Sequence, residues 1–395
     1  MLGWIARAIL ACMPTRKRAY KYRFYPTPEQ EALLAQTFGC VRKVYNLILE
    51  WRSLAFQERQ EKINYAKASA RLTELKKLPE YAYLNEVSSV PLQQCLRHQQ
   101  TAYKNFWEGR AKYPTFKKKN RRQSAELTQR AFRYREGKLF IAKSRDPLDI
   151  RWSRALPTAP TTVTITKDSA GRYFVSCLCE FTPTLLSVTP NTVGIDLGIK
   201  DLFVTDRGEK TGNPRHASKY AAQLARDQRR LARKAFGSKN RAKAKHKVAR
   251  IHAKISDCRM DNLHQLSRRL INESQVVCVE SLKVKNMIRN PMLSKHIADA
   301  GWGDFLRMLE YKADWAGRSF VAVDPFFPSS KRCSCCGTIN DALKLGEREW
   351  ICPSCSTLLD RDINAARNIK AAGLAVLACG ESVRLVSPNG ISSSQ

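Results

Sequence analysis

Acidic residues are scarce in this sequence. Its 395 residues include 35 Asp and Glu against 69 Lys and Arg, and the formal net charge at pH 7 is +34. Such an excess of positive charge is costly in self-repulsion unless a polyanion screens it, and nucleic acid is the commonest polyanionic partner. The alternative is a basic protein whose charge serves solubility alone. The composition favours a nucleic-acid-binding protein over that alternative.

Long apolar runs are also missing. No stretch approaches the roughly eighteen apolar residues that a membrane-spanning helix needs, so we expect a cytoplasmic protein with no membrane partner. The first residues, MLGWIARAILACM, are similar to the apolar core of a signal peptide. However, Arg7 interrupts this run, and basic residues 16–18 follow where small residues would form a cleavage site. We interpret residues 1–12 as an extension from an upstream start codon, with Met13 as the functional start.

Histidine is rare as well. The chain has six histidines, and no two of them flank a single hydrophobic residue. A transposase that works through a tyrosine nucleophile needs such a His-hydrophobe-His metal motif, so the sequence excludes that class. A transposase built on three acids, which has an RNase H-like fold, stays open at this point.

Cysteine, by contrast, is abundant and unevenly distributed. Five of the thirteen cysteines lie within residues 333–355, which indicates a metal site in a reducing compartment and not a disulfide framework. Four of them form two C-x-x-C pairs separated by fifteen residues: Cys333 with Cys336, and Cys352 with Cys355. Two such pairs can complete a tetrahedral zinc site, whereas a redox dithiol would need only one pair. Cys335 is out of register, and the pattern predicts structural zinc on the other four.

The first part of the chain begins with a strand and a helix start. Residues 20–25 (YKYRFY) alternate aromatic and basic side chains, as a half-buried strand does. Thr27 can cap a helix whose first turn contains Pro28 and Gln30, which is a capping-box arrangement. From there the apolar pattern stays mostly helical to about residue 110.

Further strands follow this helical stretch. Residues 132–141 and 161–181 are strand-rich, and residues 168–171 (DSAG) suit a hairpin turn. We therefore predict a small β-barrel-like (wedge) domain into which a helical recognition segment is inserted. The predicted boundaries are residues 13–30 and 125–185 for the β domain and residues 31–124 for the helical insert.

The second half has an α/β pattern. Residues 193–196 and 202–205 have strand patterns, and long helices follow between about residues 219 and 271. The predicted fold class is a multidomain α/β protein with an RNase H-like (RuvC-like) nuclease domain. Its predicted boundaries are residues 186–330 and 357–375 for the nuclease domain, 331–356 for the inserted zinc ribbon and 376–395 for a flexible tail.

Three acids lie at the ends of apolar elements, where a carboxylate is poorly solvated. Asp196 ends one apolar strand, Glu280 ends another, and Asp362 lies at the entry to an Ala-rich helix. An acid at the end of a buried strand loses solvation and needs a compensating cation, and Mg²⁺ prefers carboxylate oxygens. Two such ions, roughly 3.5–4 Å apart, would activate water and stabilise the leaving oxygen of a phosphodiester. The order of these acids along strands and helices is what an RNase H-like nuclease requires.

Each acid also has an ordinary structural interpretation. Asp196 suits a turn before Gly198, and Glu280 suits the cap of a helix near Leu282. Asp362 suits the first turn of a helix, where the helix dipole favours a negative charge. The residues taken singly leave these alternatives open.

Two basic segments are candidate nucleic-acid contacts. Within residues 112–122, five basic residues lie between Lys117 and Arg122, next to Tyr113 and Phe116, a mixture that suits backbone tracking and base stacking. Residues 226–254 hold twelve Lys and Arg with Asp227 as the single acid. The alternatives are a solvated linker and a solvated helix face. The predicted contact residues are Lys117, Lys118, Lys119, Arg121, Arg122, Arg229, Arg230, Arg233 and Lys234.

Together these features resemble the TnpB (OrfB) proteins of bacterial insertion sequences, which are related to type V CRISPR effectors. The resemblance runs from about Arg18 through nearly the whole chain. It rests on seven segments: YRFYPTPEQ at 22–30, FGCVRKVYN at 38–46, GIDLGIKDL at 194–202, VESLKVKNM at 279–287, DAGWGDF at 299–305, PSSKRCSCCG at 328–337, and CPSC at 352–355 followed by DRDINAARNI at 360–369.

The resemblance implies a guide RNA from the transposon end and a single RuvC-like site that cuts target DNA. By motif, the Mg²⁺-binding acids would be Asp196, Glu280 and Asp362, and the zinc ligands the four paired cysteines. The helical insert would grip the guide–target duplex, and the β domain would help to read a short adjacent motif. We expect a monomeric ribonucleoprotein that promotes retention of the transposon.

Two residues depart from the family pattern. Ser356 follows Cys355 where the family often has glycine, and we expect a different turn there. Leu359 precedes DRD where a polar residue is common. Competing functions are a catalytically silent RNA-guided regulator, a transposition accessory protein and the acid-triad transposase. The presence of all three acids argues against the first, and the ribbon before the third acid argues against the last.

Overall fold

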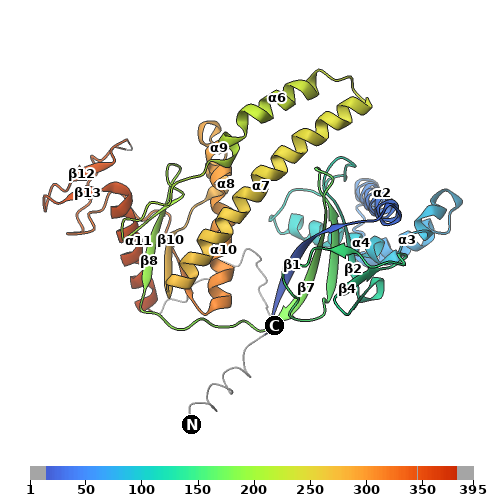
Figure 1. The fold of residues 1–395 in the computed structure, drawn as a ribbon, viewed down its shortest axis with the longest axis horizontal. Coiled ribbons are helices and arrows are strands. Elements are labelled where there is room, and N and C mark those ends of the chain that lie inside the picture. Colours follow the sequence, from blue (N-terminus) through green and yellow to red (C-terminus); the bar gives the residue numbers. More distant parts are fainter. Residues whose placement is uncertain (1–14, 345, 380–395) are drawn as a thin grey trace, which may run out of the picture. The chain divides into compact units, whose positions relative to one another are not determined.

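The computed structural model describes residues 15–344 and 346–379, which divide into two compact units (Figure 1). The first unit ends at Thr182 and also includes residues 237–250, and the second comprises residues 183–236 and those from Ile251 on. This division lies three residues before the predicted boundary at 185. The predicted extension at residues 1–12 lies outside the described residues, as does most of the predicted tail.

The first unit is built on an antiparallel sheet with the strand order β2-β6-β7-β1-β5. A separate hairpin pairs β3 with β4, and Gly171, with φ of +75°, lies in the turn between β6 and β7 at the predicted position. The strands are β1 (Arg16–Tyr25), β2 (Gln123–Thr128), β3 (Phe132–Arg135), β4 (Lys138–Ile141), β5 (Asp149–Ile150), β6 (Thr162–Lys167) and β7 (Tyr173–Phe181).

Helices are inserted between β1 and β2, as the apolar pattern predicts. Thr27 caps α2, because its hydroxyl accepts a hydrogen bond from the Gln30 N–H while the Gln30 side chain accepts one from the Thr27 N–H. A cap of this kind contributes about 1 kcal/mol. The helices of this unit are α2 (Pro28–Arg59), α3 (Tyr65–Leu75), η1 (Pro79–Asn85), α4 (Ser89–Trp107) and the short η2 (Gln129–Ala131).

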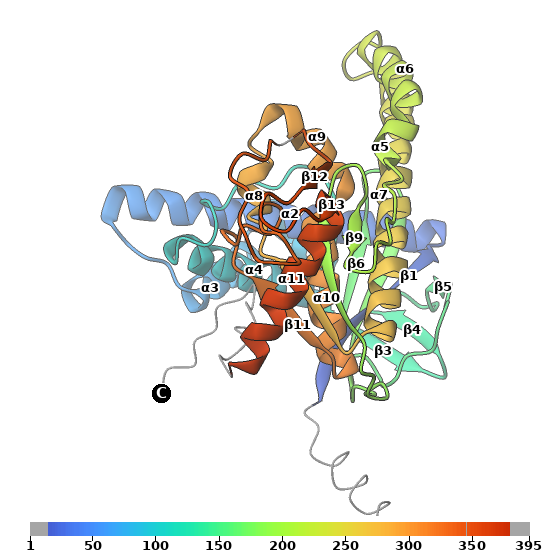
Figure 2. The same cartoon turned by 90° about the vertical axis from the view of Figure 1, so that its left-hand side faces the viewer.

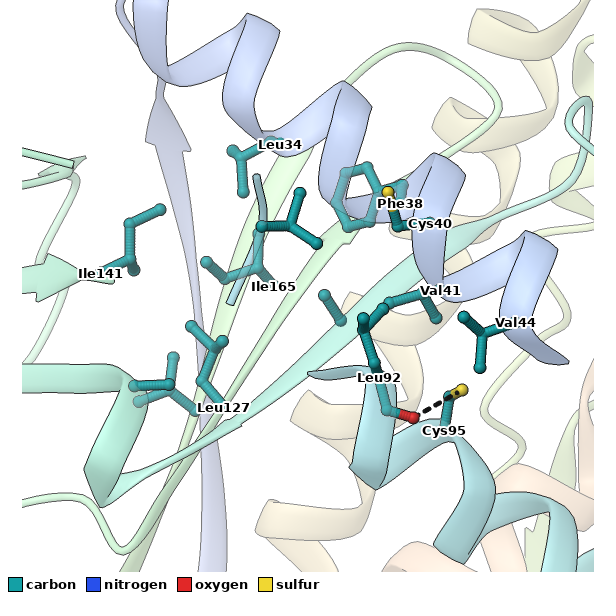
Figure 3. Close-up of a cluster of buried hydrophobic side chains, with 14 of the residues drawn as sticks. Leu34, Phe38, Cys40, Val41, Val44, Leu92, Cys95, Leu127, Ile141 and Ile165 are labelled. Carbon is teal, nitrogen blue, oxygen red and sulfur yellow. Dashed lines mark hydrogen bonds between the residues drawn. The ribbon is translucent and has the colours of Figure 1, made fainter. Parts of the chain in front are cut away.

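The core of the first unit lies between these helices and the sheet. Figure 3 shows Leu34 and Phe38 of α2, Leu92 of α4 and Leu127 and Ile165 of the strands gathered in one cluster. The helical insert between β1 and β2 therefore shares one hydrophobic core with the β domain.

The second unit contains a four-stranded sheet with the order β11-β10-β8-β9. The strands β8, β10 and β11 are parallel, and β9 is antiparallel to β8. The strands are β8 (Thr192–Leu197), β9 (Phe203–Thr205), β10 (Val276–Glu280) and β11 (Ser319–Val323), and β12 (Glu349–Ile351) pairs separately with β13 (Leu358–Asp360). The helices are α5 (His216–Lys219), α6 (Ala221–Ala232), α7 (Lys239–Glu273), α8 (Val284–Met287), α9 (Pro291–Ala300), α10 (Trp302–Ala316) and α11 (Arg361–Ala378).

Helices cover both faces of this sheet (Figures 1 and 2). Ile195, Val277 and Val279 belong to a core shared with α7 and α10, whereas Cys278 and Val321 belong to a core shared with α11. Strand side chains alternate between faces, so neighbouring residues of β10 belong to different cores. At Gly373, a Cβ atom would lie 2.5 Å from the Cys278 sulfur, so glycine lets α11 lie directly on the strand.

Some boundaries differ from the prediction. Residues 237–250, which we predicted as part of the nuclease domain, group with the first unit, where His246 lies against the hairpin turn at Gly171. The helix α11 runs to Ala378, so the predicted tail from residue 376 begins within a helix. Within residues 15–344 and 346–379, no helix is both long and apolar enough to cross a membrane.

Candidate active site and metal centre

The sheet of the second unit brings two of the predicted acids side by side. Ile195 of β8 pairs with Val279 of β10 in parallel register, so Asp196 and Glu280 are the next residues on neighbouring strands. The alternation of side chains assigns both to the face that α11 covers. Asp362 is the second residue of α11. Acids that are 166 residues apart along the chain (362 − 196) therefore meet at one end of the sheet.

The electrostatics of Asp196 reflect its burial and the two neighbouring acids. The pKa of Asp196 is raised to about 7, first by burial and then by the negative charges of Glu280 and Asp362, while Arg361 and Arg348 oppose the rise. Burial also raises the pKa of Glu280. A half-buried group of like charges is a site that attracts a divalent cation.

Two neighbouring aspartates at the start of α11 have different surroundings. Asp360 accepts hydrogen bonds from the N–H groups of Asp362 and Ile363, both at 3.0 Å, and pairs with Lys210 at 2.6 Å. Asp360 is thus a helix cap held by a lysine. The carboxylate of Asp362 instead accepts from Arg348, at 3.1 and 3.2 Å.

The acids lie near one another without forming a closed ligand set. Over the described ranges 15–344 and 346–379, the four paired cysteines are the only group of three or more His, Cys, Asp or Glu residues whose ligand atoms all lie within 4.8 Å of one another. The arginine on Asp362 and the lysine on Asp360 had no signal in the sequence, because neither residue belongs to a recognisable motif.

The four cysteines converge from the two pairs. The Sγ atoms of Cys333 and Cys355 are 3.7 Å apart, and those of Cys336 and Cys352 are 3.5 Å apart. A tetrahedral zinc with bonds of about 2.3 Å requires sulfur atoms about 3.8 Å apart. The spacing therefore fits zinc, and Cys335 is exposed and outside the group.

The two turns that carry the cysteines have the same backbone. The N–H of Gly337 donates to the Cys333 carbonyl, and the N–H of Ser356 donates to the Cys352 carbonyl, each at 3.0 Å. Gly337 has φ of +80° and Ser356 has φ of +54°. The expectation of a different turn at Ser356 is therefore wrong, because the serine adopts the left-handed conformation that glycine takes in the first turn.

We expect Ser356→Gly to stabilise the ribbon. A non-glycine residue in the left-handed region costs roughly 1 kcal/mol, and glycine removes that strain. The increase should appear as a higher midpoint for loss of zinc in a chelator titration. Ser354→Gly is the matched control: Ser354 does not have a positive φ, so a gain as large as at Ser356 would contradict the strain argument.

The ribbon is attached to the helix that carries the third acid. The Asn364 side chain donates to the Arg332 carbonyl at 2.7 Å and accepts from the Ser334 N–H at 2.8 Å. Leu359 packs in the ribbon core with Trp350, which accounts for an apolar residue before the DRD segment. The cysteine centre thus supports the start of α11, two residues from Asp362.

The predicted nucleic-acid contacts divide into two groups. Lys117 is half-buried, with its ammonium 4.2 Å from the centre of the Tyr45 ring, and its backbone N–H donates to Asn46 at 2.8 Å. The other eight residues are exposed, four in the loop before β2 and four in or just after α6: Lys118, Lys119, Arg121, Arg122, Arg229, Arg230, Arg233 and Lys234.

Comparisons with known proteins agree with this architecture. Family models match residues 302–369 (Cas12f1-like, TNB domain), residues 178–291 (OrfB IS605, "Probable transposase") and residues 13–61 (OrfB IS605 helix-turn-helix domain). The cryo-EM structure of a Cas12f1–sgRNA–target DNA complex superposes with a TM-score of 0.54 at 14% identity, covering 90% of this chain and 99% of that one. Fold and cysteine centre together define a Cas12f-like α/β protein with a TNB domain.

The relatives identify the family. A Streptomyces pristinaespiralis protein, named as a candidate RNA-guided DNA endonuclease, is 54% identical over 93% of this chain and 92% of its own length. The Escherichia coli K12 protein InsQ, named in the same way, is 33% identical over 93% of this chain and 95% of its own. The chain belongs to the TnpB (OrfB) family of IS605-type elements.

Proposed function

We propose that this protein is an RNA-guided DNA endonuclease of a transposable element, with one RuvC-like site formed by Asp196, Glu280 and Asp362. The observation that carries the proposal is the grouping of these acids at one end of the second sheet, where burial and the charges of Glu280 and Asp362 raise the pKa of Asp196. Family membership supports the same conclusion, since two relatives that cover most of the chain are named for this activity.

The strand arrangement supports an RNase H-like domain. The parallel strands β8, β10 and β11 lie next to the antiparallel β9 in one sheet. Lys210 forms a bridge with Val204 beyond β9, so a rudimentary further strand continues the sheet on that side. An acid on the first strand, an acid on the next parallel strand and an acid on a covering helix then share one site.

The three carboxylates would hold Mg²⁺. The bound ions would supply an activated water and would stabilise the leaving oxygen of the phosphodiester. The contribution of this chain is to fix the ligands: the paired strands position Asp196 and Glu280, and the capped start of α11 positions Asp362. Arg348 would then be free to pair with a phosphate, because the cation would replace it on Asp362.

The remaining parts would bind nucleic acid. We assign structural Zn²⁺ to the four cysteines, guide–target duplex binding to the helical insert, and reading of a short adjacent DNA motif to the barrel-like β domain. The exposed basic residues of the loop before β2 and of α6 would lie along phosphates. The working form would be one protein chain with one guide RNA, which mass photometry of the purified complex can measure.

Exchange of the guide segment tests the proposal. Protein expressed with its RNA should cut a matching DNA beside the adjacent motif in the presence of Mg²⁺, and a new guide segment should redirect cutting to a new match. Base pairing would choose the sequence, so the redirected and original rates should agree within about tenfold. A protein that cuts one fixed sequence with every RNA would be a conventional endonuclease, and a protein that binds the match without cutting would be a regulator.

A further inference from the structure

A cavity of about 790 Å³ lies beside the acids in the second unit. It is lined by Glu280 at the end of β10, by Leu306 on α10 and by Phe320 and Ala322 of β11, and its walls are mainly apolar. The cavity lies on the face of the sheet that α10 covers, and it adjoins the acidic cluster through Glu280, which lines it and is also one of the three acids. Its volume lies within the range of roughly 300–1,000 Å³ that small-molecule sites occupy.

The rim of this cavity combines cations with an exposed aromatic ring. Lys283, Lys285 and Arg307 line it and are exposed. Phe326 is 83% exposed, and the Lys283 ammonium lies 5.2 Å from the centre of its ring. The Phe326 N–H donates to the Asp324 carboxylate at 2.7 Å, which fixes the turn that presents the ring.

This combination matches the chemistry of a single DNA strand. Proteins bind single strands with cations that follow the phosphates and aromatic side chains that stack on the bases. Arg307 pairs with Asp304 at 2.8 Å, but an apolar small molecule would make no use of Lys283 and Lys285. A base paired inside a duplex cannot enter a cavity, so the strand must be unpaired and its base unstacked. The carboxylate of Glu310, which also lines the cavity, can accept a hydrogen bond from the amino group of cytosine or adenine.

We propose that this cavity is a nucleobase subsite for the DNA strand being cut. It takes an unstacked base next to the scissile phosphate, with Phe326 stacked on the base or its neighbour and Lys283 and Lys285 facing the backbone. The subsite positions the strand over the acids, and it rests on the proposed endonuclease function.

The test uses the full chain with its guide RNA and Mg²⁺. A single abasic nucleotide is moved through the positions around the mapped cut in an otherwise matching target. At one or two positions beside the cut, the missing base should slow cleavage by the wild type about tenfold, the order of effect that one base stack has. Phe326→Ala should slow cleavage of the intact strand by a similar factor and should not slow the abasic strand further.

A second variant fills the cavity without disturbing the core. Gly303 lines the cavity from α10, and a Cβ atom placed there meets nothing within 4 Å. Gly303→Leu should therefore fold, because leucine is the better helix former, and should slow the intact strand as Phe326→Ala does. Met292→Ala is the matched control, since Met292 is 85% exposed and outside the lining, and it should cut at the wild-type rate.

Several outcomes would overturn the subsite. Equal cleavage rates with abasic and intact strands at every position would do so. So would a cleavage rate of Phe326→Ala on the abasic strand that is lower by the product of the two separate effects. If Phe326→Ala or Gly303→Leu changed the mass of the complex but not its sensitivity to the abasic nucleotide, the cavity would be a contact with another protein chain and not a base subsite.

Binding is read separately from cleavage with 2-aminopurine at the sensitive position. Stacking should change its fluorescence in the wild-type complex and not in Phe326→Ala. Equal fluorescence in the two proteins rejects the subsite even where the wild type cuts. A fluorescence difference without any cutting rejects the endonuclease function and keeps the subsite.

Discussion

Asp196→Ala is expected to reduce RNA-guided DNA cleavage at least about a thousandfold, because a lost metal ligand removes several kcal/mol of transition-state stabilisation. Glu280→Ala and Asp362→Ala should have effects of the same size. Guide RNA binding should not change in any of the three variants, since a carboxylate carries the same charge as the RNA phosphates and does not bind them. Single-turnover cleavage of a labelled target and a filter-binding measurement with the guide RNA give the two quantities.

Asp360→Ala is the matched control at the same helix start. Asp360 caps α11 and pairs with Lys210 on the other side of the DRD segment from Asp362. Its removal should lower the free energy of unfolding by about 1 kcal/mol, as the loss of a cap does, and should leave most of the activity. If Asp360→Ala were inactive and Asp362→Ala active, the assignment of the third metal ligand to Asp362 would be wrong.

Asp196→Asn should also be more stable than the wild type when divalent cations are absent. The folded-state pKa of about 7 lies above the ordinary value of about 3.9, so the folded protein binds this proton more tightly than the unfolded chain. The wild type should therefore lose stability relative to Asp196→Asn as the pH rises from about 4 to about 7, by about 1–3 kcal/mol for a half-buried group, with no further change above. Urea unfolding in EDTA at pH 5 and pH 8 measures the free energy of unfolding of both proteins. A wild type that is more stable relative to Asp196→Asn at pH 8 than at pH 5 would contradict the prediction.

Cys352→Ser is expected to release one equivalent of zinc and to unfold residues 331–360. Cys352 is buried with its sulfur against that of Cys336, and in small zinc domains the metal contributes roughly 10–16 kcal/mol to folding at pH 7. Because Asn364 ties the ribbon to the start of α11, cleavage should fall as well, although no ligand of the acidic site is changed. Elemental analysis gives the zinc content, and limited proteolysis should show new cuts confined to the ribbon.

The neighbouring cysteine supplies the control for this variant. Cys335 is exposed and outside the four-sulfur group, so Cys335→Ser should keep its zinc and its resistance to protease. Zinc-free wild-type protein that is nevertheless folded would reject the metal centre, and equal zinc loss in both variants would reject the choice of ligands.

The sequence by itself determined the features that depend on neighbouring residues. The capping box at Thr27 and Gln30 needs only a spacing of three residues, and the hairpin turn at 168–171 needs only its own turn residues. The two cysteine pairs could be predicted for the same reason, because each turn is built from a C-x-x-C segment. The acids were recognisable as unusual, since each follows or begins an apolar element.

Tertiary structure decided what depends on residues distant in the chain. The pairing of β8 with β10 sets Asp196 beside Glu280, and the packing of α11 on the sheet adds Asp362, so the raised pKa of Asp196 exists only in the folded protein. The arginine on Asp362 and the cavity near Phe326 had no sequence signal, because their contacts join segments that no periodic pattern links. Ser356 illustrates the same limit on a local scale. Serine does not favour the left-handed backbone conformation. Ser356 adopts it because the two cysteine turns must bring their sulfur atoms to one site.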